Sequence, residues 1–341
     1  MNNLKNEQSK SNTNEPTLSN TYLFGQNSVN ANKTLINNLI NDNLVIINEN
    51  NNINNNKNTI KIDKKYENNL ILEIMTSWNL PEGYNLIIKN KHGLENSLIK
   101  RNLKEKGDRN IVYFGFQREE DLNTNPNIDY LLYPKEDFYD SKYIGKHFQI
   151  RYDDNDKLYY IKDLGFGFGT FIKLTKDIKL KDNFLINIGE TYIVFSIKNN
   201  NNDNDNDKIS ESLNEEDKYE NDKENVNDKN SINIKVFSGD EKCDNYNFDY
   251  FSNPTILIGR NAYCDIAIED KMLSRVHCTV FFNNGEKNED RGWYLKDGNL
   301  NGKKSTNDTW FYSAEETLIE DNMIFKTNHN LFKCIIKQEK K

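Results

Sequence analysis

Short apolar runs confined to two blocks of the sequence are the feature that most constrains this fold. The blocks extend from Leu70 to Lys198 and from Ile232 to Lys337. Inside them, the runs alternate apolar and polar residues or are continuously apolar, and Gly, Asn and Asp separate one run from the next. No stretch of useful length has the period of an amphipathic helix. The pattern therefore predicts an all-β chain of two tandem antiparallel β-sandwiches.

The rest of the chain is polar and biased in composition. Residues 1–68 are Asn-rich and carry apolar residues only in short clusters, such as Leu44 to Ile47. Residues 199–231 contain 11 Asp and Glu residues against 4 Lys, which accounts for nearly all of the formal charge of −8. Neither stretch can bury enough apolar surface to offset the entropy of ordering it, so we expect a disordered tail and a flexible acidic linker. The predicted domains are accordingly residues 69–198 and 232–338.

The sequence argues against a membrane protein, a secreted protein and a nucleic-acid-binding protein. No run approaches the roughly 18 consecutive apolar residues of a membrane-spanning helix, and the first residues, MNNLKNEQSKSNTNEPT, lack the basic and then apolar layout of a signal peptide. The two blocks together are near neutral and carry no basic stripe interleaved with aromatic residues. We therefore expect a nuclear or cytoplasmic protein with no membrane partner and no direct nucleic-acid partner.

Cysteine and histidine spacing predicts neither a metal site nor an active site. None of the cysteines has CxxC spacing or a nearby His in the manner of a zinc finger, and we expect reduced thiols in the core: Cys243, Cys264, Cys278 and Cys334. The glycines from Gly165 to Gly169 precede a strand-like run, whereas a phosphate-cradling loop precedes a helix. We predict no catalytic residue, no metal and no cofactor, and hence a protein that is not an enzyme.

The two blocks also repeat one another. Each contains a strand, a turn that begins with Gly, a strand led by His, a strand that ends in Asp, a polar turn that ends in Thr and an aromatic residue, and two final strands. Duplication of one domain is the simplest explanation of this order.

Three motifs of the second block follow the pattern of a known family. They are Gly259-Arg260, Leu273-Ser274-Arg275-Val276-His277 and Ser305-Thr306-Asn307-Asp308-Thr309. In this order they resemble the forkhead-associated (FHA) domain, whose pattern is GR, SxxH and SxNGT. The pattern also makes chemical sense, because a planar Arg fork and a Ser hydroxyl supply the charge-assisted donors that a phosphate requires.

The resemblance implies a set of phosphopeptide-binding residues. Arg260 and Ser274 would bind the phosphate of a phosphothreonine, and Asn307 would hold the peptide backbone just after it. Arg275 and Thr306 would be flanking donors. Taken singly, Arg260 is more commonly a solvated turn residue and Ser274 a turn cap. Taken together, in the spacing of the family, the two residues favour binding over this alternative.

Other motif residues are expected to support the loops. Gly259 and His277 belong to this group, because the family's His holds the loops from inside and does not contact ligand. One position departs from the family, since Asp308 replaces the Gly that follows Asn307. We expect a positive φ there, which Asp tolerates less well than Gly, and a carboxylate near the anion that reduces affinity.

The first block resembles the same family in its skeleton but not in its ligand positions. The supporting residues that it retains are His147, Gly169 and Thr170. The ligand positions are apolar, with Phe116, Ile144 and Phe168 in place of Arg, Ser and Asn. Apolar side chains cannot bind phosphate, so we predict an FHA-like domain that has lost the usual site. Phe166 and Phe168 either fold inward or contact a partner protein.

The resemblance implies a non-catalytic signalling adaptor that binds phosphothreonine-containing proteins through its C-terminal domain. The alternative is a structural scaffold that binds unmodified partners and has a vestigial phosphate site. A third hypothesis is a targeting subunit that regulates a kinase or processing enzyme in trans. The tail contains Thr17 in the sequence NEPTL, so self-association through a phosphorylated tail bound at the C-terminal site is a further hypothesis.

Overall fold

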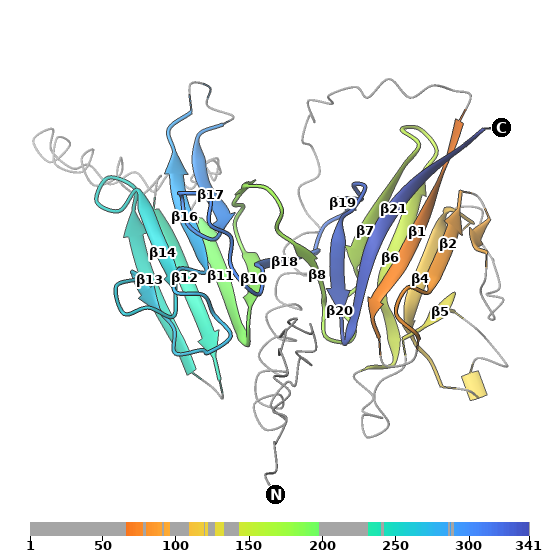
Figure 1. The fold of residues 1–341 in the computed structure, drawn as a ribbon, viewed down its shortest axis with the longest axis horizontal. Helices are drawn as coiled ribbons and strands as arrows, with labels where there is room; N and C mark the ends of the chain where they lie inside the picture. The colour runs from red at the N-terminus through yellow and green to blue at the C-terminus, as the bar shows by residue number, and fades with distance from the viewer. Residues whose placement is uncertain are drawn as a thin grey trace, which may run out of the picture.

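The computed structural model shows an all-β chain, which confirms the predicted fold class (Figure 1). Strand pairing is antiparallel apart from the short parallel pairs β4–β5 and β14–β15. Almost all of the predicted tail and acidic linker lies outside the described residues. The described residues are 66–77, 80–90, 92–95, 109–118, 120–121, 127–132, 143–197, 231–239, 242–285, 287 and 290–340.

The strands form two sandwiches, which we call body I and body II. Body I contains β1 (Tyr66–Thr76), β2 (Asn85–Lys89), β3 (Gly93–Leu94), β4 (Ile111–Phe116), β5 (Tyr130–Leu131), β6 (Gly145–Asp153), β7 (Leu158–Asp163), β8 (Thr170–Lys173), β19 (Thr317–Leu318), β20 (Ile324–Thr327) and β21 (Asn330–Lys340). Body II contains β9 (Ile178–Lys179), β10 (Phe184–Ile188), β11 (Thr191–Ile197), β12 (Ser231–Ser238), β13 (Lys242–Asp249), β14 (Thr255–Gly259), β15 (Ile266–Ala267), β16 (Cys278–Asn283), β17 (Gly292–Asp297) and β18 (Trp310–Tyr312).

Body II is inserted into body I along the chain. The chain builds β1 to β8 of body I, crosses to body II for β9 to β18, and returns for β19 to β21 (Figure 1). One sheet of body I has the order β3-β2-β1-β21-β20-β8, and one sheet of body II has the order β18-β10-β11-β12-β13. Because β8 pairs with β18, these two sheets form a single 11-stranded sheet. The sheets β19-β7-β6-β4-β5 and β15-β14-β16-β17-β9 close the two bodies.

This pairing does not follow the two consecutive blocks, 69–198 and 232–338, that the sequence predicts as domains. β11, which ends the first block, pairs with β12 and not with β1. β21, which ends the second block, pairs with β1 and not with β12. Both terminal strands carry the same alternation of apolar and polar residues, so the pattern that predicts a strand does not specify which sandwich that strand completes.

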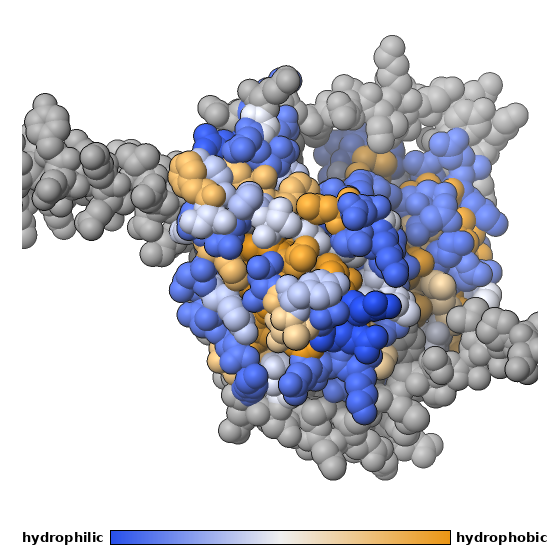
Figure 2. Space-filling model, turned by 60° about the vertical axis from the view of Figure 1, so that its left-hand side comes forward, coloured by the Kyte–Doolittle hydropathy of each residue, from blue (hydrophilic) through white to orange (hydrophobic). Residues whose placement is uncertain are grey.

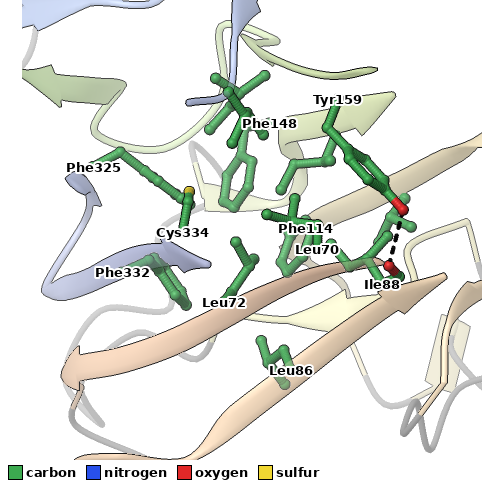
Figure 3. Close-up of a cluster of buried hydrophobic side chains, with 14 of the residues drawn as sticks. Leu70, Leu72, Leu86, Ile88, Phe114, Phe148, Tyr159, Phe325, Phe332 and Cys334 are labelled. Carbon is green, nitrogen blue, oxygen red and sulfur yellow. Dashed lines mark hydrogen bonds between the residues drawn. The ribbon is translucent and has the colours of Figure 1, made fainter. Parts of the chain in front are cut away.

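The core of body I draws on both segments of the chain that build it (Figure 3). The ring of Phe148 in β6 packs against Phe325 and Phe332 of the returning strands, with centroid distances of 5.5 and 6.4 Å. Tyr159 lies in the same core, and its hydroxyl donates to the main-chain oxygen of Ile88 at 3.1 Å. Since the residues before and after body II share one core, neither segment can bury its apolar face without the other.

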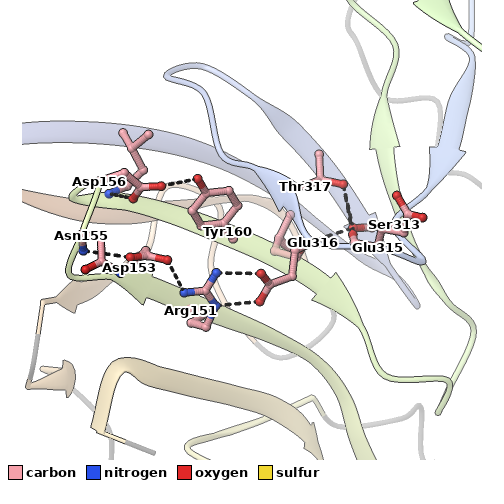
Figure 4. Close-up of polar contacts among 11 residues, drawn as sticks. Arg151, Asp153, Asn155, Asp156, Tyr160, Ser313, Glu315, Glu316 and Thr317 are labelled. Carbon is pink, nitrogen blue, oxygen red and sulfur yellow. Dashed lines mark hydrogen bonds and ion pairs between the residues drawn. The ribbon is translucent and has the colours of Figure 1, made fainter. Parts of the chain in front are cut away.

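Polar contacts hold the returning segment where it re-enters body I (Figure 4). Arg151 donates from Nε and Nη2 to the two carboxylate oxygens of Glu316, at 2.7 and 2.6 Å, and from Nη1 to Asp153 at 2.9 Å. The hydroxyl of Ser313 donates to the main-chain oxygen of Ile161 at 3.3 Å. A two-pronged Arg–carboxylate pair has a defined geometry, so it fixes the direction in which β19 joins β7.

The four cysteines are free thiols. Cys264, Cys278 and Cys334 are buried, in agreement with the expectation of core thiols. The same expectation is wrong for Cys243, which is exposed because it lies on β13, the edge strand of the large sheet.

Candidate functional site

Loops at one end of body II bring together three of the predicted binding residues. Arg260 follows β14, Ser274 precedes β16, and Thr306 lies between β17 and β18. The main-chain N–H of Thr306 donates to Ser274 Oγ at 2.9 Å, and that hydroxyl donates to Thr306 Oγ1 at 3.2 Å. The main-chain N–H of Arg260 donates to the main-chain oxygen of Ser274 at 3.1 Å. Residues far apart in the sequence therefore meet in one cluster of loops.

The two predicted arginines are available to a ligand. Arg260 and Arg275 are both exposed. Within the part of body II that the structure describes, neither guanidinium forms an ion pair. An unpaired guanidinium on the same group of loops as a Ser hydroxyl is a suitable partner for an anion with several oxygens.

Asn307, the predicted peptide-holding residue, lies in the same loops. Its side-chain Nδ2 donates to the main-chain oxygen of Met272 at 2.6 Å. Its own main-chain oxygen accepts a hydrogen bond from Trp310 Nε1 at 3.3 Å. Asn307 is thus held from two sides, by the loop that carries Ser274 and by the first residue of β18.

His277 is buried beneath these loops and hydrogen-bonds two of them. Its Nδ1 accepts from the main-chain N–H of Ser274 at 3.2 Å. Its Nε2 therefore carries the proton, which it donates to the main-chain oxygen of Asp308 at 3.0 Å. Burial lowers the pKa of His277, so the ring stays neutral and keeps this tautomer at neutral pH.

Asp297 is a supporting residue whose importance the sequence does not reveal. It is 3% exposed at the end of β17 and accepts from Ser305 Oγ at 2.6 Å and Thr309 Oγ1 at 2.8 Å. The main-chain N–H of Ser305 also donates to it, at 3.3 Å. These bonds fix both ends of the turn that presents Thr306 and Asn307. The available signal was the motif order, in which a strand ending in Asp precedes a Ser and Thr-rich turn.

Two backbone positions in body II have the geometry that the motifs demand. A Cβ on Gly259 would lie 2.4 Å from the main-chain oxygen of Arg275, so only Gly allows these loops to approach. Asp308 has a φ of 58°, as expected from the Gly that it replaces. Its carboxylate is paired with Lys173 of body I, at 2.8 Å, a contact that the sequence could not predict.

The corresponding loops of body I carry aromatic residues at positions where body II has the predicted binding residues. Phe168 packs on Tyr143 at a centroid distance of 4.8 Å and near His329 at 6.0 Å, while Phe166 is 47% exposed. Of the two predicted alternatives, Phe168 therefore folds inward, and Phe166 keeps an exposed face.

The supporting residues of body I lie where the repeat places them. His147 is buried, its Nε2 donates to the main-chain oxygen of Tyr143 at 2.7 Å, and Asn328 Nδ2 donates to its Nδ1 at 3.4 Å. Gly169 has a φ of 80°, and Thr170 is buried at the start of β8. Phe116, which stands in the position that corresponds to Arg260, is also buried.

Two buried titratable groups of body I make opposing contributions to its stability. Burial raises the pKa of Asp163 to about 6 and lowers the pKa of His147 to about 4. As pH falls from about 6.5 to 4, protonation of Asp163 stabilises the folded state, whereas the cost of protonating His147 destabilises it. Each effect amounts to about 3 kcal/mol, so they nearly cancel in the wild type.

We expect Asp163→Asn to expose the contribution of His147. The free energy of unfolding of body I should then fall by about 3 kcal/mol between pH 7 and pH 4, as measured by denaturant titration. His147→Gln should give the opposite slope. Equal pH dependence in both variants and the wild type would contradict the assigned pKa shifts.

The comparison with protein families agrees with the sequence motifs. The FHA domain family model matches residues 126–189 and 256–325. No curated protein matches the chain. A solved structure that matches is the crystal structure of the Slr1951 protein from Synechocystis sp., with 17% sequence identity and a TM-score of 0.15, covering 27% of this chain and 87% of that chain. Two regions of the sequence match this same family model, one beginning in body I and one beginning in body II, as expected for two FHA domains in tandem.

Proposed function

We propose that body II binds phosphothreonine-containing peptides and that the chain is an adaptor in phosphorylation-dependent protein interactions. FHA domains are phosphothreonine-binding interaction modules and are non-catalytic. The observation that carries the proposal is the cluster of Arg260, Ser274 and Thr306, in which an exposed guanidinium without an ion pair lies on the loops that hold two hydroxyls. Asn307 lies next to this cluster and would hold the peptide backbone after the phosphothreonine.

Exposed apolar side chains on the same loops favour a particular kind of residue near the phosphothreonine of the peptide. Tyr263, Leu300 and Met272 are 63%, 49% and 39% exposed. Figure 2, turned so that body II comes forward, shows apolar groups in orange among the hydrophilic surface in blue. Large exposed apolar side chains around a charged site favour a peptide with an apolar residue near its phosphothreonine.

Body I lacks these donors and is proposed to contribute support or contacts with unmodified protein. The exposed ring of Phe166 is the observation that favours a contact surface there. No helix in the described residues is long and apolar enough to cross a bilayer. Among those residues there is also no group of three or more His, Cys, Asp or Glu that could hold a metal ion.

The test is a titration of the full chain with a degenerate phosphothreonine peptide library and its unphosphorylated twin. Binding should require the phosphate, and Arg260→Ala should weaken it by about 30-fold or more, because a charge-assisted bond to the anion is lost. Arg291→Ala is the matched control, since Arg291 lies over the ring of Tyr250, 5.7 Å from its centroid, and should leave binding unchanged. Equal binding to both libraries would contradict the proposal and favour the scaffold alternative, with Phe166→Ala as the next variant.

A further inference from the structure

Two lysines of body I lie against the turn of body II that carries Asn307. Lys173 ends β8, and its partner in the ladder with β18 is Trp310. Its Nζ lies 2.8 Å from Asp308 Oδ2, and both side chains are 29% exposed. Lys326 comes from β20, and its Nζ lies 4.6 Å from the centroid of the Trp310 ring. Both lysines therefore reach across the junction of the two bodies.

Lys173 pairs with the residue of the turn that has a left-handed backbone conformation. Asp308 has a φ of 58°, in the left-handed region that Gly adopts freely and Asp adopts less readily. The ion pair with Lys173 favours this conformation and also compensates the carboxylate charge. The expected repulsion between Asp308 and a bound phosphate is thereby reduced. Since Asn307 precedes Asp308, the ion pair also restricts the position of Asn307.

Lys326 reaches the same turn through the hairpin between β10 and β11. Its Nζ donates to Asn187 Oδ1 at 2.7 Å, and Asn187 Nδ2 donates to the main-chain oxygen of Thr191 at 3.1 Å. This bond shapes the tip of the hairpin. At that tip, the main-chain N–H of Glu190 donates to Asp270 Oδ2 at 3.0 Å. Lys326 thus orients a hairpin that supports the loop around Asp270.

The loop around Asp270 completes a ring of contacts. Asp270 Oδ1 accepts from the main-chain N–H of Met272 at 2.7 Å, and the main-chain oxygen of Met272 accepts from Asn307 Nδ2 at 2.6 Å. On the other side, the indole N–H of Trp310, whose ring faces Lys326, donates to the main-chain oxygen of Asn307. The contacts of Lys326 therefore reach both the side chain and the backbone of Asn307.

We propose that body I sets the affinity of the phosphopeptide site of body II, with Lys173 and Lys326 as positioning residues for Asn307. This inference rests on the proposed function of that site. Neither lysine belongs to the predicted set of peptide-binding residues. Their effect is to hold the turn in one conformation before the peptide arrives, which lowers the entropy lost on binding. Both bodies then contribute to a single binding site, and the role of body I is to hold the turn that carries Asn307, without a phosphate site of its own.

The test measures how tightly full-length variants bind the best phosphothreonine peptide from the library. Lys173→Met and Lys326→Met should each weaken binding about fivefold. Lys89→Met is the control, because Lys89 pairs with Glu95 in body I, at 2.6 Å, on a strand remote from β18 in the sheet order. Lys173→Arg keeps the ion pair and should retain wild-type affinity. The unfolding temperature of every variant shows whether a loss of binding is a loss of folding.

A second variant separates positioning from a general effect of charge. Asp308→Gly removes both the strained residue and the partner of Lys173, so Lys173→Met should cause no further loss in that background. If wild-type binding depends on Arg260 but Lys173→Met and Lys326→Met both bind like the wild type, this inference is wrong and the proposed function stands. Absence of any phosphate-dependent binding by the wild-type chain would overturn both.

Discussion

Residues 178–312, expressed alone, are expected to fold cooperatively, and residues 232–341 are not. The first fragment contains every strand of body II, from β9 to β18. The second fragment lacks β9, β10 and β11 and carries β19, β20 and β21, which belong to body I. Without β10 and β11, the buried residues Ile186, Ile193 and Phe195 are missing from the core of body II. Loss of several buried side chains exceeds the stability of an ordinary domain.

Denaturant unfolding followed by circular dichroism distinguishes the two fragments. Residues 178–312 should give a single cooperative transition and bind the phosphothreonine peptide more weakly than the full chain, because Lys173 and Lys326 are absent. Residues 232–341 should give no cooperative transition and no specific binding. A stable, peptide-binding fragment 232–341 would show that the terminal strands can complete body II, contrary to the pairing in the structure.

Asp297→Ala is expected to lower the stability of body II more than the other substitutions proposed in its loops. It leaves the hydroxyls of Ser305 and Thr309 and one main-chain N–H without their buried acceptor. Unsatisfied buried donors cost about 1 to 3 kcal/mol each, so we expect body II to lose about 3 kcal/mol or more. The turn that presents Asn307 also loses its anchor, and peptide binding should weaken at least tenfold.

The control for this variant is Asp177→Ala, because Asp177 forms an ion pair at the surface. Asp177 lies 3.1 Å from Lys296 and is 40% exposed, so Asp177→Ala should change stability by less than about 1 kcal/mol. Denaturant titration gives the stability of each variant, and the peptide titration gives the affinity. Equal losses in the two variants would show that Asp297 does not have the supporting role assigned to it.

The sequence predicts the fold class and the loops of the site because both depend on local patterns. Alternation along β14 and β16 predicts strands, and the motifs around Arg260, Ser274 and Asn307 predict loops that the structure brings together. The sequence did not predict the strand order. β11 and β21 have similar apolar alternation, and nothing local distinguishes their partners. The contact between Lys173 and Asp308 depends on that order, and so lay beyond sequence reasoning as well.

Because body II is inserted into body I, the two repeats of the sequence do not correspond to the two bodies. Each FHA match crosses a boundary between the bodies. The first match begins in body I and ends just after β10 of body II, and the second begins in body II and ends in β20 of body I. The repeated units of the sequence are therefore not the folded units of the structure. The last strands of each body come from the other repeat, so neither repeat contains all the strands of one sandwich.

Disulfide trapping tests this shared architecture most directly. Ser196 of β11 is paired with Asn233 of β12. If each repeat folded by itself, β11 would pair with β1 instead. From the register of β21 on β1, Ser196 would then be paired with Ile71. The experiment uses two variants of the full chain, both with Cys243 replaced by Ser. One variant carries Ser196→Cys and Asn233→Cys, and the other carries Ser196→Cys and Ile71→Cys. We expect rapid intramolecular crosslinking of the first pair and none of the second, since paired strands bring Cα atoms within disulfide range. Crosslinking of the second pair in place of the first would contradict the shared architecture.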